Sequence, residues 1–168
     1  MLLVIVCCAT LCSSILAKPV QNTTFIFDLL LKLDDQEMDE LIKVMKIMRD
    51  TSLTIEDRCA KVEPFLEGKI PNKALRLVME LNDYVVKLVE SSASSKVKDL
   101  FNKFRDLWID KKFLKMKFEE KKAAVEKIRN SFSKNEVKEL EKLEMKIKKK
   151  QKELGIEDFA DMFTGLNE

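Results

Sequence analysis

Residues 69–109 place the strongest constraint on the fold of this chain. Their sequence, KIPNKALRLVMELNDYVVKLVESSASSKVKDLFNKFRDLWI, predicts two helices joined by a serine-rich turn at Ser91–Ser95. Pro71 suits the first turn of the first helix. In that helix polar residues recur at three- and four-residue steps and form one narrow stripe, and nearly all the remaining positions are apolar. The stripe consists of Lys73, Arg76, Glu80, Asp83, Lys87 and Glu90. Because a surface helix has the opposite balance, this helix must be surrounded, either by packed neighbours or by an apolar molecule that the protein holds.

The rest of the chain also has helical periodicity. Asp34–Glu37 and Ser133–Glu136 have the pattern of a capping box, Thr54–Asp57 opens a further helix, and Gly68 is placed to end it. Residues 111–117 are either a continued helix or a basic connector, and residues 156–163 suggest a terminal helical turn. No strand-like alternation occurs in the sequence. We therefore expect an all-α, single compact domain of about six to eight amphipathic helices around the central helix pair.

The first 17 residues differ from the remainder. They carry no charge, are apolar almost throughout and end in Ile15-Leu16-Ala17, which predicts a signal peptide followed by one helical domain over 18–168. An uncleaved membrane anchor is the alternative, but the segment is short for a bilayer span and contains Ser13-Ser14. We therefore expect a secreted, extracellular protein. Asn22 begins an Asn-Thr-Thr glycosylation sequon, for which a chance triplet is an equally good interpretation.

The composition removes most catalytic chemistries. The sequence has no histidine, and Cys59 is the only cysteine after the expected signal peptide. The sequence therefore excludes a histidine-based triad, a disulfide within the mature chain, and zinc or iron–sulfur sites. It also contains no phosphate-binding loop. We expect no enzyme activity, no metal and no cofactor.

The charges are nearly balanced. The chain has 31 basic and 29 acidic residues, a net charge of +2, which argues against nucleic acid as the main partner. The one local excess of lysine lies in residues 138–153. Such a run is usually a solvated helix face, and attraction to an anionic membrane surface is the weaker alternative.

Several short runs carry a resemblance to a known family. They are LTIEDR at 53–58, GKIP at 68–71, KA at 73–74, EL at 80–81, KVKDLF at 96–101 and RDL at 105–107. Over residues 33–132 the chain resembles the nematode fatty-acid- and retinol-binding (FAR) proteins. The resemblance implies a secreted helical carrier that holds fatty acids or retinol non-covalently in an internal apolar cavity.

The ligand-binding candidates come from the two central helices. They are Leu77, Val78, Leu81, Asn82, Val85, Leu88, Leu100, Phe104, Arg105 and Trp108. For each apolar member, a place in an ordinary core is at least as good an interpretation. Asn82 either bonds a lipid hydroxyl or carboxylate or bonds a neighbouring backbone group. Arg105 either pairs with a ligand carboxylate at the cavity mouth or is solvated.

A second class of function stays open. Periodicity alone favours a helix at the centre of a dry core, which would make the protein a secreted protein–protein interaction module, such as an SXP/RAL-like antigen or effector. The preferred lipid, the oligomeric state and the role of Cys59 do not follow from the sequence.

Overall fold

A computed structural model of the chain describes residues 30–66 and 72–155. Five expectations therefore lie outside the described residues. They are the signal peptide over 1–17, the sequon at Asn22, the helix end at Gly68, the first-turn Pro71 and the terminal turn over 156–163.

The described residues form helices and their connections. The helices are α3 (Asp35–Arg49), α4 (Ile55–Leu66), α5 (Asn72–Ser92), α6 (Ser95–Leu107), α7 (Lys111–Leu114), α8 (Phe118–Arg129) and α9 (Lys134–Glu153). No strand occurs among the residues described. The all-α prediction is confirmed, and the number of helices falls in the expected range.

Local sequence signals fix several helix starts. The Asp34 carboxylate accepts from the Glu37 N–H at 2.8 Å, and the Glu37 carboxylate accepts from the Asp34 N–H at 2.9 Å. Ser133 and Glu136 exchange the same pair of bonds at the start of α9. Each exchange satisfies backbone donors that a helix start leaves without an intrahelical partner. Both predicted capping boxes are therefore confirmed.

The serine-rich turn is shorter than predicted. Helix α5 continues through Ser92, and the Ala93 N–H still donates to the Val89 carbonyl at 2.9 Å. Ser94 is the N-cap of α6, but its side chain forms no capping hydrogen bond. Its N–H donates instead to the Glu139 carboxylate on α9. Helix α9 thus supplies the acceptor for the N–H of the N-cap residue of α6.

Residues 111–117, which the sequence left ambiguous, contain the single-turn helix α7. The Asp110 carboxylate caps it by accepting from the N–H groups of Lys112 and Phe113 at 2.7 and 3.1 Å. Phe113 and Leu114 are buried. A helix of one turn has little stability of its own, so tertiary packing holds this one in place.

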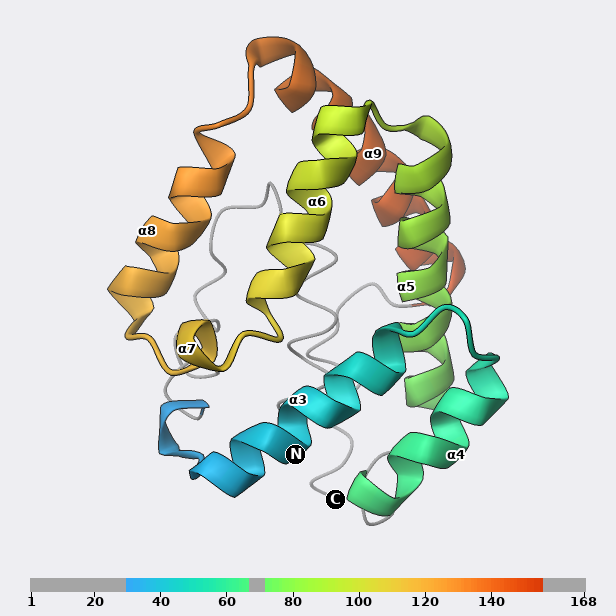
Figure 1. Ribbon diagram of the computed structural model, residues 1–168. Coiled ribbons are helices and arrows are strands. Elements are labelled where there is room, and N and C mark those ends of the chain that lie inside the picture. The colour runs from blue at the N-terminus through green and yellow to red at the C-terminus, as the bar shows by residue number, and fades with distance from the viewer. Residues whose placement is uncertain (1–29, 67–71, 156–168) are drawn as a thin grey trace.

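Helix α5 is the centre of the arrangement. It packs against α3, α4, α6 and α9, and α6 in turn packs against α8. In Figure 1, α5, α6 and α8 stand side by side, α9 lies behind α5, and α3 and α4 cross the end at which α5 begins. The expectation of a central helix pair is confirmed for α5 and α6.

The apolar interior of the described residues consists of two clusters. The first cluster joins α3, α4 and the first half of α5 to Phe104, Trp108, Phe113 and Leu114. The second cluster joins the second half of α5 to Val97 and Phe101 of α6 and to the inner face of α9. Helix α5 therefore spans both clusters, which explains why it is apolar on so much of its circumference.

Candidate functional site

Neighbouring helices cover part of the polar stripe of α5. Its exposed members are Lys73, Arg76, Lys87 and Glu90, whereas Glu80 and Asp83 are half-buried. The Glu80 carboxylate accepts from Lys150 Nζ of α9 at 3.0 Å, and Asp83 pairs with Arg58 of α4. The stripe is therefore not a free solvated face. It supplies the two acidic groups by which α4 and α9 are joined to α5.

The ten ligand-binding candidates do not come together in one place. Val78, Phe104 and Trp108 belong to the first cluster, and Leu81, Val85 and Leu88 belong to the second, with the half-buried Leu77 packed beside it. Leu100 is buried but belongs to neither cluster, while Asn82 and Arg105 are half-buried. The structure thus places the apolar candidates inside the protein and divides them at the boundary between the two clusters.

The two polar candidates have protein contacts. The Asn82 side-chain amide donates to the Asp83 carboxylate at 3.2 Å, which is neither of the two partners that the sequence suggested. The Arg105 guanidinium lies 5.6 Å from the centroid of the Phe101 ring, a cation–π arrangement. Arg105 therefore lies on an aromatic surface that belongs to the second cluster.

Trp108 is the centre of an aromatic group in the first cluster. Its ring meets Phe104 edge-on at a centroid distance of 6.3 Å and Phe113 edge-on at 5.4 Å. Edge-to-face contacts of this kind add to the free energy gained by burying the rings. Trp108 thus connects the end of α6 to α7.

The sequence did not identify the most buried charged group of α4. Arg58 has an exposed fraction of 0 %. Its Nη1 donates to the Met48 carbonyl at 3.0 Å and to Asp83 Oδ1 at 2.8 Å, and its Nη2 donates to Asp83 Oδ2. One guanidinium therefore joins the end of α3 to α5. The available signal was spacing, because Arg58 lies three residues after Ile55 and four before Val62, on the apolar side of the helix.

Lys121 of α8 is a second buried cation that the sequence did not identify. It is the only residue of α8 that is fully buried. The apolar residues of that helix, among them Ala124, Val125 and Ile128, are only partly buried and pack against the first cluster. Helix α8 therefore covers the cluster at its margin.

Several acidic groups tie α7 to the start of α3. Lys111 Nζ donates to Asp39 at 2.8 Å and lies 3.6 Å from the Asp35 carboxylate, which also binds Lys115. The hydrogen bond from Lys115 lowers the pKa of Asp35, and the bond to Asp39 raises the pKa of Lys111. Both shifts favour the charged forms, so these contacts persist at neutral pH.

Cys59 is a buried thiol and not a reactive one. Its exposed fraction is 7 %, its Sγ lies 3.8 Å from the Met79 sulfur, and burial raises its pKa. We expect alkylation of Cys59 by iodoacetamide at pH 8 to be at least about tenfold slower in the native protein than in urea, because the thiolate is the nucleophile. Peptide mapping by mass spectrometry measures the rate at Cys59 alone. Equal native and denatured rates would contradict the buried position.

The described residues offer no site for a metal and no membrane span. No group of three histidine, cysteine, aspartate or glutamate side chains within 30–66 and 72–155 is arranged to hold a metal ion. No helix in the same residues has both the length and the apolar character that crossing a bilayer requires.

Comparison of the chain with protein-family models, with curated proteins and with solved structures gave no match. The geometry of the described residues and the resemblance noted in the sequence are therefore the two grounds for a functional proposal.

Proposed function

We propose that the protein is an exported helical carrier that binds a fatty acid or retinol non-covalently within the helical domain, at the boundary between the two apolar clusters. The reaction class is reversible binding, with no covalent step, metal or cofactor. The resemblance to the FAR family supports the ligand class, and the division of the described interior into two clusters supports the location.

The observation that carries the proposal is the division of the interior. A domain of this size usually has one contiguous core with smaller clusters at its margin. Here the described buried residues form two substantial clusters on the same helix. The division also crosses α6, where Phe101 belongs to one cluster and Phe104 to the other, and Leu100 is buried outside both. An acyl chain or a polyene placed there would gain about 0.8 kcal/mol for each CH₂ removed from water.

A pair of overpacking variants tests the location. Leu75 lies within the first cluster with an exposed fraction of 1 %, so Leu75→Phe is expected to lower the free energy of unfolding by about 1–3 kcal/mol. Leu100→Phe is expected to cost less than about 1 kcal/mol, because the added ring enters space that a ligand otherwise takes. It is also expected to weaken oleate binding about tenfold or more, the usual effect of a changed fit in an apolar pocket.

The measurements are urea denaturation and displacement of a fluorescent fatty acid from delipidated protein. A blue-shifted probe that oleate displaces, with affinity reduced in Leu100→Phe, supports the carrier. If the wild-type protein takes up no probe or retinol and Leu100→Phe is as destabilising as Leu75→Phe, the interior is dry. That outcome replaces the carrier with the interaction module.

Arg105 is the proposed partner of the ligand carboxylate. Its half-buried position on Phe101 puts a cation beside the boundary between the clusters. Arg105→Ala is expected to weaken binding of a fatty acid about tenfold more than binding of the neutral alcohol of equal length, because only the acid loses a charge-assisted hydrogen bond. Displacement titrations with oleate and oleyl alcohol measure the difference. Lys103→Ala, an exposed cation on the same helix, is the control, and equal losses for both ligands would remove Arg105 from the site.

A further inference from the structure

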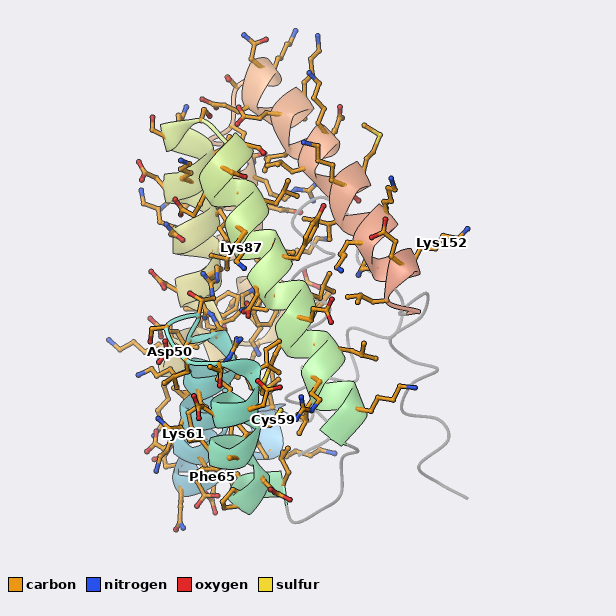
Figure 2. All side chains as sticks on the ribbon, turned by 90° about the vertical axis from the view of Figure 1, so that its right-hand side faces the viewer. Asp50, Cys59, Lys61, Phe65, Lys87 and Lys152 are labelled. Carbon is orange, nitrogen blue, oxygen red and sulfur yellow. The ribbon has the colours of Figure 1, made fainter. Side chains whose placement is uncertain are left out.

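Helix α9 has two very different faces. Leu140, Leu143 and Ile147 are buried in the second cluster, so this face is fully used in packing against α5. On the opposite side, lysines recur at positions 134, 138, 142, 149 and 152, and all five are exposed. We refer to these five residues as the outer lysine stripe. In Figure 2, α9 runs along the edge of the molecule and Lys152, at the end of the stripe, points away from it.

The first three lysines of the outer lysine stripe are not arranged for the stability of the helix. Lys134, Lys138 and Lys142 follow one another at four-residue steps, and like charges at this spacing destabilise a helix. None of the five lysines forms an ion pair with any residue in the part of the chain that the structure describes. By contrast, Lys148 and Lys150, on the flanks of the helix, pair with Glu144 and Glu80. Lys148 and Lys150 are thus paired, whereas the five lysines of the outer lysine stripe are presented to solvent.

One apolar side chain lies within the stripe. Met145 has an exposed fraction of 64 %, whereas Leu31, the other large apolar residue exposed within the described part of the chain, has 42 %. At 100° per residue, it falls between Lys138 and Lys152 on the helical circumference. This flexible, unbranched side chain therefore has Lys142 and Lys149 one helical turn before and after it, with the exposed Glu141 also beside it.

We propose that the outer lysine stripe docks the protein on the surface of an anionic lipid bilayer. A 20-residue helix is a straight rod of about 30 Å, so the stripe presents a line of cations that fits a flat anionic surface. The apolar face of α9 is already packed on α5, so the helix adsorbs through its charges and does not insert. Met145 is the one side chain placed to enter the headgroup region. The whole chain has a net charge of +2, so the residues outside the outer lysine stripe have a net charge of −3 and add no attraction of their own.

A bilayer fits this surface better than a nucleic acid does. The stripe contains no arginine for bidentate phosphate contacts and no aromatic ring on which a base could stack. The proposal also does not depend on the bound lipid, since adsorption through α9 requires no ligand inside the protein.

The test compares partitioning of the full chain, purified from a eukaryotic host, onto phosphatidylcholine vesicles with and without 30 % phosphatidylserine (about one anionic lipid in three). Each lysine near such a surface strengthens adsorption roughly fivefold. The triple variant K138Q/K142Q/K149Q is therefore expected to bind anionic vesicles on the order of a hundredfold more weakly. Binding of the wild-type protein is expected to fall steeply when salt is raised from 0.05 to 0.5 M (about a tenfold change), because screening shortens the range of the charges.

Two matched variants separate charge on α9 from charge in general. K46Q/K61Q/K103Q removes three exposed lysines from α3, α4 and α6 and is expected to bind as the wild-type protein does. K138R/K142R/K149R keeps the charge on α9 and is expected to retain binding. Insertion of the apolar residues 1–17 into the bilayer would depend on neither phosphatidylserine nor salt. It would therefore not produce the expected dependence of binding on phosphatidylserine, salt and the charge of α9.

Three results would overturn the proposal. They are equal partitioning onto the two kinds of vesicle, equal weakening by the two glutamine variants, and binding of a duplex oligonucleotide more tightly than anionic vesicles at the same salt concentration. Circular dichroism confirms that each variant is folded. A protein that takes up no fatty acid but meets the vesicle expectations would refute the carrier and leave the docking surface intact.

Discussion

Asp83→Ala is expected to lower the free energy of unfolding by about 3–5 kcal/mol, the largest effect of any single charged residue described here. The reason is that the substitution leaves Arg58 without an anionic partner among the described residues. The guanidinium is fully buried, and the Asp83 carboxylate is its only anionic partner among the described residues. Removing that carboxylate leaves a buried cation with only the Met48 and Thr54 carbonyls as acceptors. Urea denaturation followed by far-ultraviolet circular dichroism measures the loss.

Two further variants test whether the loss of stability comes from the unpaired buried charge of Arg58 or from the loss of a side chain. Asp106→Ala removes an exposed carboxylate that lies 4.0 Å from Arg49, and it is expected to change stability by less than about 0.5 kcal/mol. Arg58→Met combined with Asp83→Leu removes both charges and is expected to recover at least half of the loss caused by Asp83→Ala. If the double variant is less stable than Asp83→Ala, the unpaired charge on Arg58 is not the main cause of the loss, and the ion pair itself stabilises the fold.

The features that the sequence predicted correctly depend on neighbours within one helical turn. Capping boxes join residues three apart, and apolar runs such as Val78, Leu81 and Val85 follow from the pitch of a helix. Both kinds of signal are complete within a short window of the chain. The starts of α3 and α9, and the number of helices within the described residues, could be predicted for this reason.

The features that were missed depend on how helices cross. Arg58 and Asp83 are 25 residues apart, and Lys150 and Glu80 are 70 apart. Spacing indicates that Arg58 lies on the apolar side of α4, but it does not say which helix supplies the anion. The acceptor of the Ser94 N–H is a further example, because Glu139 lies on α9, 45 residues along the chain.

The candidate site shows the same division between local and tertiary information. Helical spacing correctly predicted that Val78, Leu81 and Val85 face the interior. It did not predict that the first belongs to a different cluster from the other two. That boundary arises because α3 and α4 cover one half of α5, whereas α9 covers the other half. The boundary at which we propose the ligand to bind is thus a property of the packed helices.

Phe113→Ala is expected to lower the free energy of unfolding by about 3–5 kcal/mol and to shift the emission of Trp108 to longer wavelength. Phe113 has an exposed fraction of 2 % and meets the Trp108 ring at a centroid distance of 5.4 Å. It is also one of two buried residues on α7, which cannot persist as a single turn without that anchor. The cost therefore combines a cavity beside the indole with the release of the connection between α6 and α8.

The spectroscopic part of this experiment is specific, because Trp108 is the only tryptophan in the chain. Water that reaches the indole after Phe113 is truncated changes its emission, and urea denaturation gives the change in stability in the same samples. Lys112→Ala is the matched control, since Lys112 is exposed on the same turn and donates to the Asp110 carboxylate through its backbone N–H, which alanine keeps. It is expected to change stability by less than about 0.5 kcal/mol and to leave the emission unchanged. Native emission and near-native stability in Phe113→Ala would contradict this account. They would mean that Leu114 and the Asp110 cap are enough to hold α7 in place, and that other residues shield Trp108 from water.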